Sequence, residues 1–169
     1  VTYTHPWGGS TMILLTRVDH RLLHGQVAVS WVNGLKANCV FVVGDHVAND
    51  PVWKTTLRLG KPAGCKLVVK DMARAIESLK SGVTDKYRMI ICVGSIAEAK
   101  QLAEGYQKIR SINLGNTKES PTTRTLTKQV FVEPDEEQML RDMAADGIEL
   151  EYRALADDPK VDVAKLLDE

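Results

Sequence analysis

Short apolar runs along this chain alternate with segments in which apolar residues recur every three or four positions. Short runs bounded by turn residues predict buried strands, and the longer periodic segments between them predict amphipathic helices. The first run leads into a charged loop and then a helix, and similar units repeat towards the C-terminus. The predicted strands are residues 12–15, 39–44, 66–70, 88–93, 112–114, 125–132 and 148–152.

Residues that commonly begin helices mark the segments between these strands. Asp71 is placed to cap one helix, and Pro134 suits the first position of another. Ser95 and Glu98 have the spacing of a capping box. The predicted helices are residues 27–35, 50–60, 71–82, 95–102, 134–147 and 158–167.

The alternation of strands and helices predicts the fold class. It favours an α/β domain with an open, mostly parallel central sheet of about seven strands flanked by helices. We expect segment 125–132 at a sheet edge and an antiparallel strand near the C-terminus. Residues 12–169 contain no repeat or linker, so we predict a single domain. Residues 1–11 lack periodicity and precede Met12, and we interpret them as an extension added in cloning.

Composition and charge restrict the classes of partner. Hydrophobic residues make up 44% of the chain, charged residues make up 26%, and 22 basic residues balance 22 acidic ones. The overall composition therefore lacks the basic excess expected of a protein that binds nucleic acid or an anionic membrane. The longest apolar runs, residues 40–43 and 89–93, are too short to span a bilayer. We expect neither a nucleic-acid partner nor direct insertion into a membrane.

The three cysteines predict no special chemistry. Cys39, Cys65 and Cys92 are spread singly at or within apolar runs. This pattern is typical of buried, reduced thiols in a cytosolic protein. No histidine and cysteine pair has the spacing of metal ligands, so no metal site is predicted.

The candidate chemistry lies in the loop after the first strand. In an open α/β sheet, such loops at the carboxyl ends of strands collect ligands and catalytic groups. Neutral imidazole is a competent nucleophile near neutral pH, and we predict that His24 accepts a phosphoryl group. Arg21 would grip the phosphoryl oxygens, and Asp19 would hold Arg21 or orient the imidazole. On these residues alone, a purely structural role for His24 remains an alternative.

Further donors for a phosphoryl group are expected beside His24. The backbone N–H groups of Gly25, Gln26 and Val27 lie at a predicted helix start, where they have no helical partner and the dipole favours an anion. Arg17 would add positive charge. Phosphoryl transfer depends mainly on positioning and charge stabilisation, so this set is chemically sufficient.

A second group of side chains could line the same crevice. Asp45 and His46 follow the second predicted strand, and His20 lies in the first loop. The alternative for all three is a solvated loop residue. Ser95 is better explained as a helix cap than as a catalytic hydroxyl.

The run at residues 17–27, Arg-Val-Asp-His-Arg-Leu-Leu-His-Gly-Gln-Val, is followed by Trp31 in the next helix. It resembles, without gaps, the signature of the sugar-specific IIB component of the bacterial phosphotransferase system (PTS), mannose/fructose/sorbose family. Segments 45–50 and 61–62 are also similar, so the resemblance covers residues 12–169. His20 replaces an acidic residue of many members. The turn at 115–117 also departs from the family pattern, so its contribution to the site stays open.

The resemblance implies a phosphoryl relay on an open, mostly parallel seven-strand sheet. His24 would accept phosphate, on Nδ1, from a phosphohistidine of the IIA component and pass it to a sugar in the membrane-embedded IIC/IID permease. Arg21 would clamp the phosphoryl group, and Asp19 matches an acidic position of the family. The activity would be that of a protein-Nπ-phosphohistidine–sugar phosphotransferase without a cofactor. The protein would be cytoplasmic and peripherally associated with the permease; its sugar and its state as monomer or homo-oligomer stay open.

Two alternatives from other classes are weaker. A histidine phosphatase would carry Arg-His-Gly, but Leu23 precedes His24 here. A non-catalytic α/β regulatory or binding module would carry no transferable phosphate on His24. IIB families that are phosphorylated on cysteine are disfavoured, because Cys39 and Cys92 lie in strands without a phosphate-binding loop after them.

Overall fold

The computed structural model describes residues 12–169, so the interpretation of residues 1–11 as an added extension lies outside the described residues. The strands of the main sheet are β1 (Ile13–Asp19), β2 (Cys39–Val43), β3 (Lys66–Lys70), β4 (Met89–Val93), β5 (Ser111–Asn116), β8 (Glu149–Tyr152) and β9 (Val161–Asp162). They are ordered β3-β2-β4-β1-β5-β8-β9. Neighbours are parallel, except that β9 runs antiparallel to β8. The predicted open, mostly parallel sheet is confirmed.

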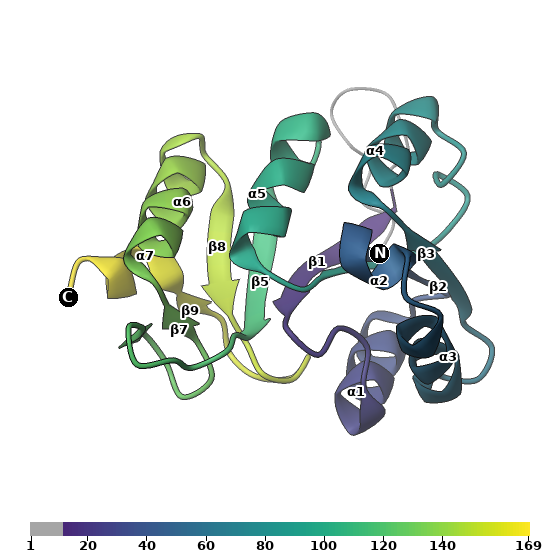
Figure 1. The fold of residues 1–169 in the computed structure, drawn as a ribbon, viewed down its shortest axis with the longest axis horizontal. Helices are drawn as coiled ribbons and strands as arrows, with labels where there is room; N and C mark the ends of the chain where they lie inside the picture. Colours follow the sequence, from purple (N-terminus) through teal and green to yellow (C-terminus); the bar gives the residue numbers. More distant parts are fainter. Residues whose placement is uncertain (1–11) are drawn as a thin grey trace.

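Helices cover both faces of this sheet. They are α1 (Gly25–Leu35), α2 (Asp45–Ala48), α3 (Pro51–Gly60), α4 (Met72–Ser81), α5 (Ile96–Gly105), α6 (Pro134–Ala145) and α7 (Val163–Leu167). Figure 1 shows α1 and α3 below the sheet and α4, α5 and α6 above it. Between Met12 and Glu169, no helix is long and apolar enough to cross a membrane.

Alternating side chains of the central strands build two hydrophobic cores. In β2, Phe41 and Val43 face the core shared with α4, α5, α6 and α7. Val40 and Val42 face the other core, shared with α1 and α3. A strand covered on both faces buries every side chain, which explains why β2 is a continuous apolar run rather than an alternating one.

The three cysteines belong to these cores. Cys39, Cys65 and Cys92 are buried and free, as predicted. Burial raises the pKa of Cys39 to about 11 and that of Cys92 to about 12. Both thiols therefore stay protonated and unreactive near neutral pH.

Polar caps begin two helices where the sequence predicts them. The Asp71 carboxylate accepts the backbone N–H of Arg74 at the start of α4, and the Ser95 hydroxyl accepts that of Glu98 at the start of α5. Such caps stabilise a helix by about 1 kcal/mol each. The Glu98 carboxylate accepts the hydroxyl of Ser95, and not its backbone N–H, so the predicted capping box forms only in half.

The prediction of one strand over residues 125–132 is wrong. This segment forms a separate hairpin from β6 (Arg124–Thr125) and β7 (Phe131–Val132). The N–H of Leu126 donates to the carbonyl of Val130, which closes a tight loop between the two short strands. The hairpin lies outside the main sheet, so its loop is free to approach the carboxyl end of that sheet.

The last helix begins later than predicted. Its expected start at Asp158 is replaced by α7 from Val163, because residues 161–162 pair with β8 as β9. Asp162 then caps α7 by accepting the N–H of Ala164. The antiparallel strand expected near the C-terminus is therefore present, and it displaces the first turn of the expected helix.

Candidate active site

Strand β1 carries charged residues into the sheet. The sequence predicts a loop from Arg17 onward, but β1 continues to Asp19 because Arg17 pairs with Cys92 of β4 and Asn113 of β5. Arg17 and Asp19 are only 4% and 0% exposed. Partners on both sides of a central strand bury whatever side chains that strand carries.

A network of polar contacts holds the Arg17 guanidinium. Its Nη1 donates to Asn113 Oδ1 at 2.8 Å and to the carbonyl oxygen of Arg153 at 3.0 Å. Its Nη2 lies 3.4 Å from Asp19 Oδ2, and its central carbon lies 5.3 Å from the centroid of the Trp31 ring. Burial lowers the pKa of Arg17, and the negative charge of Asp19 opposes this shift. Arginine keeps its proton in proteins, so the end of β1 holds a fixed positive charge.

The loop that joins β1 to α1 has a strained backbone. Leu22 has a φ of 59°, which is unusual for leucine, and Gly25 has a φ of 45°. Asp19 shapes the loop, since its carboxylate accepts the N–H of Arg21 at 3.0 Å and its carbonyl accepts the N–H of Leu22 at 2.9 Å. A left-handed non-glycine residue costs about 1–2 kcal/mol and is typical of functional loops.

His24 stands at the N-cap position of α1, where its side chain makes no capping hydrogen bond. Its Nδ1 lies 3.9 Å from Asp19 Oδ2, which is beyond hydrogen-bond distance. Both ring nitrogens are shielded from solvent, and neither meets the geometry of a hydrogen bond to another residue of 12–169, although the Leu22 backbone is close enough to favour the protonated ring. Buried polar atoms without hydrogen bonds lower the stability of the folded state, so their presence at His24 indicates a functional and not a stabilising role for this side chain.

The environment of His24 lowers the pKa of its imidazole. Burial is the main cause, the positive charges of Arg21 and Arg17 add to it, and the negative charge of Asp19 opposes it. The neutral ring is therefore favoured in the folded protein. This is the form that has a lone pair available for attack on phosphorus.

We expect His24 to titrate below the ordinary histidine pKa of about 6.5. The contribution of His24 to the free energy of unfolding is fully present above a pH of about 6.5. It is lost as the pH falls through the folded-state pKa of His24, because the unfolded chain binds the proton first. Arg21→Gln should raise the pKa of His24, and Asp19→Asn should lower it. NMR titration of the ring protons measures these shifts. A His24 pKa above 6.5 in the wild type, or a decrease in Arg21→Gln, would contradict this electrostatic account.

A cavity of about 230 Å³ opens beside this imidazole, and we call it the His24 cavity. Among the predicted site residues, it brings together Arg17, Asp19, Arg21, His24 and Val27. Arg21 is exposed, so its guanidinium has freedom to follow a bound group.

The backbone N–H groups predicted to bind phosphate lie next to this cavity. Gly25 and Gln26 are the first two residues of α1, and both are exposed. Val27 follows them and lines the cavity. The first N–H groups of a helix have no helical partner, so they remain available to an anion.

Sequence reasoning missed four residues of the His24 cavity. These residues come from the end of β5, from the β6–β7 hairpin and from the segment after β8; they are Asn116, Gln129, Ala154 and Leu155. They lie about a hundred positions from His24 in the chain, and no local pattern distinguishes them. The strand order, which places β5 beside β1, brings the first of them to the site.

One residue of the turn at 115–117, whose contribution the sequence left open, lies at the candidate site. Asn116 lines the His24 cavity, and its carbonyl accepts the N–H of His20 at 3.0 Å. Gly115 leaves room for the buried guanidinium, because a Cβ atom there would overlap the central carbon of Arg17. A residue without a side chain is therefore required at position 115, because the Arg17 guanidinium occupies the space.

We expect Gly115→Ala to lower the free energy of unfolding by about 1–3 kcal/mol, the usual cost of overpacking. Gly60→Ala is a matched control, because its Cβ would meet only the carbonyl of Leu23 at 3.7 Å. Urea denaturation of both variants measures the difference. Equal stabilities would mean that Arg17 has another position available.

His20 and His46 line a different cavity, of about 210 Å³, together with Leu22, Trp53 and Glu98. The structure thus groups these two predicted residues with each other and not around the His24 cavity. Burial raises the pKa of Glu98 in this setting.

Asp45 has a structural contact instead of lining either cavity. Its Oδ1 accepts the N–H of Met72 at 2.9 Å, at the beginning of α4. It also starts α2, the short helix that replaces the expected loop.

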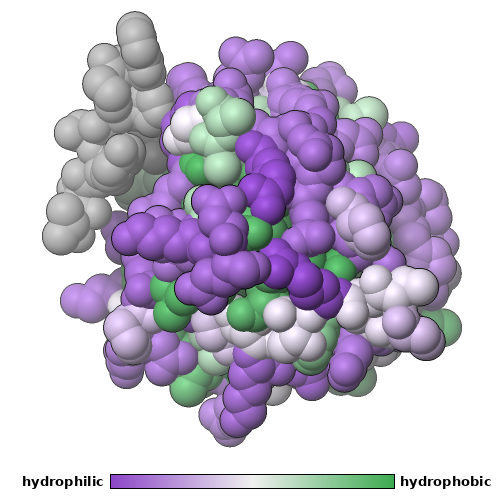
Figure 2. All heavy atoms as spheres, turned by 90° about the vertical axis from the view of Figure 1, so that its left-hand side faces the viewer, coloured by the Kyte–Doolittle hydropathy of each residue, from purple (hydrophilic) through white to green (hydrophobic). Residues whose placement is uncertain are grey.

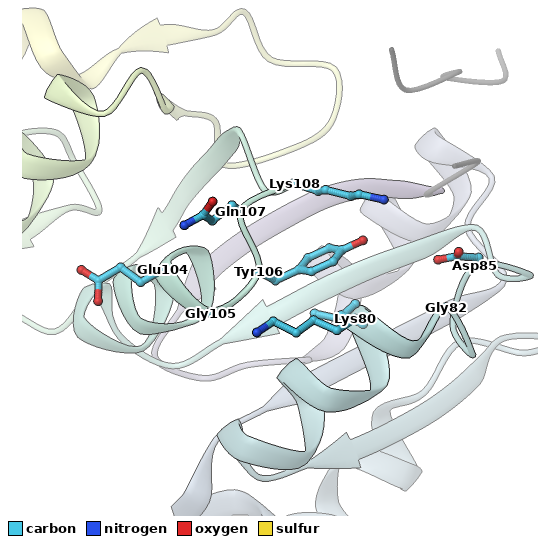
Figure 3. Close-up of a pocket in the computed structure, with 9 residues that line it drawn as sticks. Lys80, Gly82, Asp85, Glu104, Gly105, Tyr106, Gln107 and Lys108 are labelled. Carbon is cyan, nitrogen blue, oxygen red and sulfur yellow. The ribbon is translucent and has the colours of Figure 1, made fainter. Parts of the chain in front are cut away.

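Another cavity, of about 490 Å³, lies between the C-terminal ends of α4 and α5. Figure 3 shows the side chains of Lys80, Asp85, Glu104 and Lys108 spread around Tyr106. No histidine or cysteine lines this cavity. It also lies at the amino edge of the parallel sheet, away from the edge where such folds bind ligands. The His24 cavity is the better candidate for chemistry.

The chain matches a known protein family over nearly its whole length. Residues 13–169 match the family model described as "PTS system sorbose subfamily IIB component". Among curated relatives, the chain is 29% identical over 155 residues to the "N-acetylgalactosamine-specific phosphotransferase enzyme IIB component 2" of Escherichia coli (strain K12). That match covers 92% of this chain and 98% of the relative.

A second relative is longer. The chain is 32% identical over 156 residues to the "PTS system mannose-specific EIIAB component" of Escherichia coli (strain K12), covering 92% of this chain. It spans about half the length of that relative, with 48% covered. Among solved structures, the IIBSor domain of the sorbose permease from Klebsiella pneumoniae is similar with a TM-score of 0.87 and 28% identity. That similarity covers 92% of this chain and 96% of the other.

Proposed function

This chain belongs to the sorbose subfamily of IIB components of the phosphotransferase system, and from this membership we propose that it relays a phosphoryl group through His24. The observation that carries the proposal is the imidazole itself. It stands at the N-terminus of α1, beside two arginines, with both ring nitrogens unpaired within the described chain. A depressed pKa keeps it neutral, as a nucleophile requires.

The proposed first transfer exchanges one N–P bond for another. The lone pair on Nδ1 of His24 attacks the phosphorus of a phosphohistidine on the IIA component. The donor imidazole, which carries a proton on its other ring nitrogen, leaves as a neutral ring with the electron pair of its broken N–P bond, and His24 keeps its proton on Nε2. In the second transfer a sugar hydroxyl oxygen attacks the phosphorus, the hydroxyl proton passes to a base or to water, and His24 is released as the leaving group.

The surrounding residues have distinct proposed roles in both transfers. Arg21, exposed beside the His24 cavity, clamps the phosphoryl oxygens with its planar guanidinium. The first N–H groups of α1 add donors. Asp19 holds the loop by accepting the backbone N–H of Arg21, and Arg17 balances the charge of that carboxylate. A phosphoryl group on Nδ1 therefore lies beside the Arg17–Asp19 ion pair, whose charges cancel, and not beside an unpaired Asp19 carboxylate.

Partners follow from the same chemistry. We propose that a phosphorylated IIA component is the donor and that a sugar held by a IIC/IID permease is the acceptor, so the protein works in the cytoplasm next to a membrane. The activity is that of a protein-Nπ-phosphohistidine–sugar phosphotransferase. No dissociable cofactor is needed, because the phosphoryl group is carried covalently. The relatives' names mention mannose, sorbose and N-acetylgalactosamine, and the His24 cavity does not select one of them.

The decisive experiment is intact-mass measurement after incubation with phosphoenolpyruvate, the general phosphotransferase proteins and a mannose-type IIA component. We expect the mass of one acid-labile phosphoryl group, located on His24 by peptide mapping. Phosphorus NMR of the phosphoprotein distinguishes attachment at Nδ1 from attachment at Nε2. A donor shown to be active on another IIB component, yet giving no gain here, would favour the non-catalytic binding module.

A further inference from the structure

Helix α3 has an exposed face that the phosphoryl relay does not use. Val52 and Leu59 are 74% and 84% exposed, although both are large apolar residues. With Thr55 and Arg58 they lie on one side of the helix, opposite the buried Leu57. We call Val52, Thr55, Arg58 and Leu59 the α3 face. The Thr55 hydroxyl donates to the carbonyl of Pro51, which further lowers the polarity of this face.

The α3 face lies in the basic part of a molecule with no net charge. Residues 51–70 contain five basic residues and no acidic one, whereas residues 133–169 contain thirteen acidic and four basic residues. The sheet order places β3 at one edge and β9 at the other, so these segments lie at opposite ends (Figure 1). Figure 2, which views the end formed by α6 and α7, shows a largely hydrophilic surface there. The overall charge balance thus conceals a basic end.

The basic side chains at α3 are not neutralised by neighbours. Lys54 and Arg58 lie on the helix and Lys61 follows it. None of the three forms an ion pair with another described residue. The Lys61 ammonium donates to the carbonyl of Cys65 at 2.8 Å. The charges of Lys54 and Arg58 meet no carboxylate within residues 12–169, so they attract anionic surfaces.

Helix α3 also adjoins the loop that carries His24. A Cβ atom on Gly60, the last residue of α3, would lie 3.7 Å from the carbonyl oxygen of Leu23. Trp53 of α3 lines the same cavity as His20 and Leu22 of that loop. Both contacts come from the side of α3 opposite the α3 face, so a surface that binds the α3 face lies about one helix diameter, roughly 10 Å, from this loop.

We propose that the α3 face adsorbs to an anionic phospholipid bilayer and so holds the His24 edge of the protein at the membrane surface. This inference rests on the proposed function, in which the phosphoryl acceptor is a sugar held by a membrane protein. Exposed aliphatic side chains flanked by lysine and arginine on an amphipathic helix match the interfacial region of a bilayer. A protein partner fits less well, because lysine is depleted and aromatic residues are enriched in protein interfaces.

Co-sedimentation with lipid vesicles tests this proposal. The protein is mixed with vesicles of phosphatidylcholine alone, or of phosphatidylcholine and phosphatidylglycerol in equal parts, at low and high salt. We expect binding to require phosphatidylglycerol and to weaken with salt. Val52→Asp with Leu59→Asp should lower the partition coefficient by roughly tenfold or more, since two exposed aliphatic groups lose their place in the interface. Arg58→Glu should weaken binding without removing an apolar group.

Val83→Asp is the matched control, because Val83 is also apolar and 58% exposed but lies after α4. It should bind as the wild type does. The proposal is overturned if binding ignores phosphatidylglycerol, if Val83→Asp loses as much as the α3 variants, or if binding appears only with vesicles that contain the permease. Phosphate incorporation measured without vesicles on the same samples reports on His24 separately, so failure of the relay and failure of membrane adsorption give different results.

Discussion

His24→Ser is expected to abolish phosphate incorporation while leaving the protein as stable as the wild type, or up to about 1 kcal/mol more stable. His24 occupies the N-cap of α1 with extended backbone angles, φ −150° and ψ 136°, but its imidazole caps nothing. A serine hydroxyl in this position accepts a free N–H of the first helical turn. The variant therefore exchanges the proposed nucleophile for a cap that the helix lacks.

Two measurements on the same preparation check this expectation. Intact mass after incubation with the phosphorylated donor should show no gain, and urea denaturation should show an unchanged or higher midpoint. The pair separates loss of chemistry from loss of folding. Retained acid-labile phosphate in His24→Ser would place the acceptor elsewhere. A large loss of stability would instead mean that the imidazole is a structural group.

Arg17→Met is expected to lower the free energy of unfolding by about 3–5 kcal/mol, the usual cost of removing one partner of a buried ion pair. Asp19 has no exposed surface, and Arg17 is its cationic neighbour at 3.4 Å. Methionine fills part of the volume beside Trp31 but leaves the carboxylate without a counter-charge. Asn113 also loses the donor to its side-chain oxygen.

A double-mutant cycle identifies the cause of this loss. Combining Arg17→Met with Asp19→Asn should recover part of the stability, because the uncompensated charge is then absent. Arg74→Met is the control: its ion pair with Asp71 has a distance of 3.7 Å and the Arg74 side chain is 77% exposed, so only a small effect is expected. Similar losses for Arg17→Met and Arg74→Met, in urea denaturation, would contradict the role given to burial.

Local pattern was sufficient for most of the fold. The apolar runs of β2 and β4 give those strands nearly their observed bounds, because a strand covered on both faces must be apolar throughout. The edge strand β3 is marked instead by three apolar residues between two lysines. Asp71 and Ser95 mark helix starts by a short-range hydrogen bond that the sequence specifies directly. Pattern failed at residues 125–132, where a tight loop interrupts the alternation, and at residues 158–162, where pairing with β8 overrides helix formation.

The candidate nucleophile and its neighbours were also predictable from the sequence. His24, Arg21 and Asp19 lie within six positions of one another, and the residues around them carry the resemblance to the IIB family. Proximity in the chain did not reveal which residues of this loop line the same cavity. His20 and His24 are four positions apart but line different cavities, because the strained turn at Leu22 directs them to different sides of the loop.

The sequence by itself determined the order of strands and helices, the caps and the loop that holds His24, because each depends on residues close together in the chain. Only the tertiary structure decided that Arg17 and Asp19 are buried, since this requires β4 and β5 on either side of β1. It also decided that Asn116, Gln129 and Leu155 complete the His24 cavity. Finally, it placed the basic segment 51–70 and the acidic segment 133–169 at opposite edges of the sheet. Strand order, and not sequence order, decides which segments lie far apart.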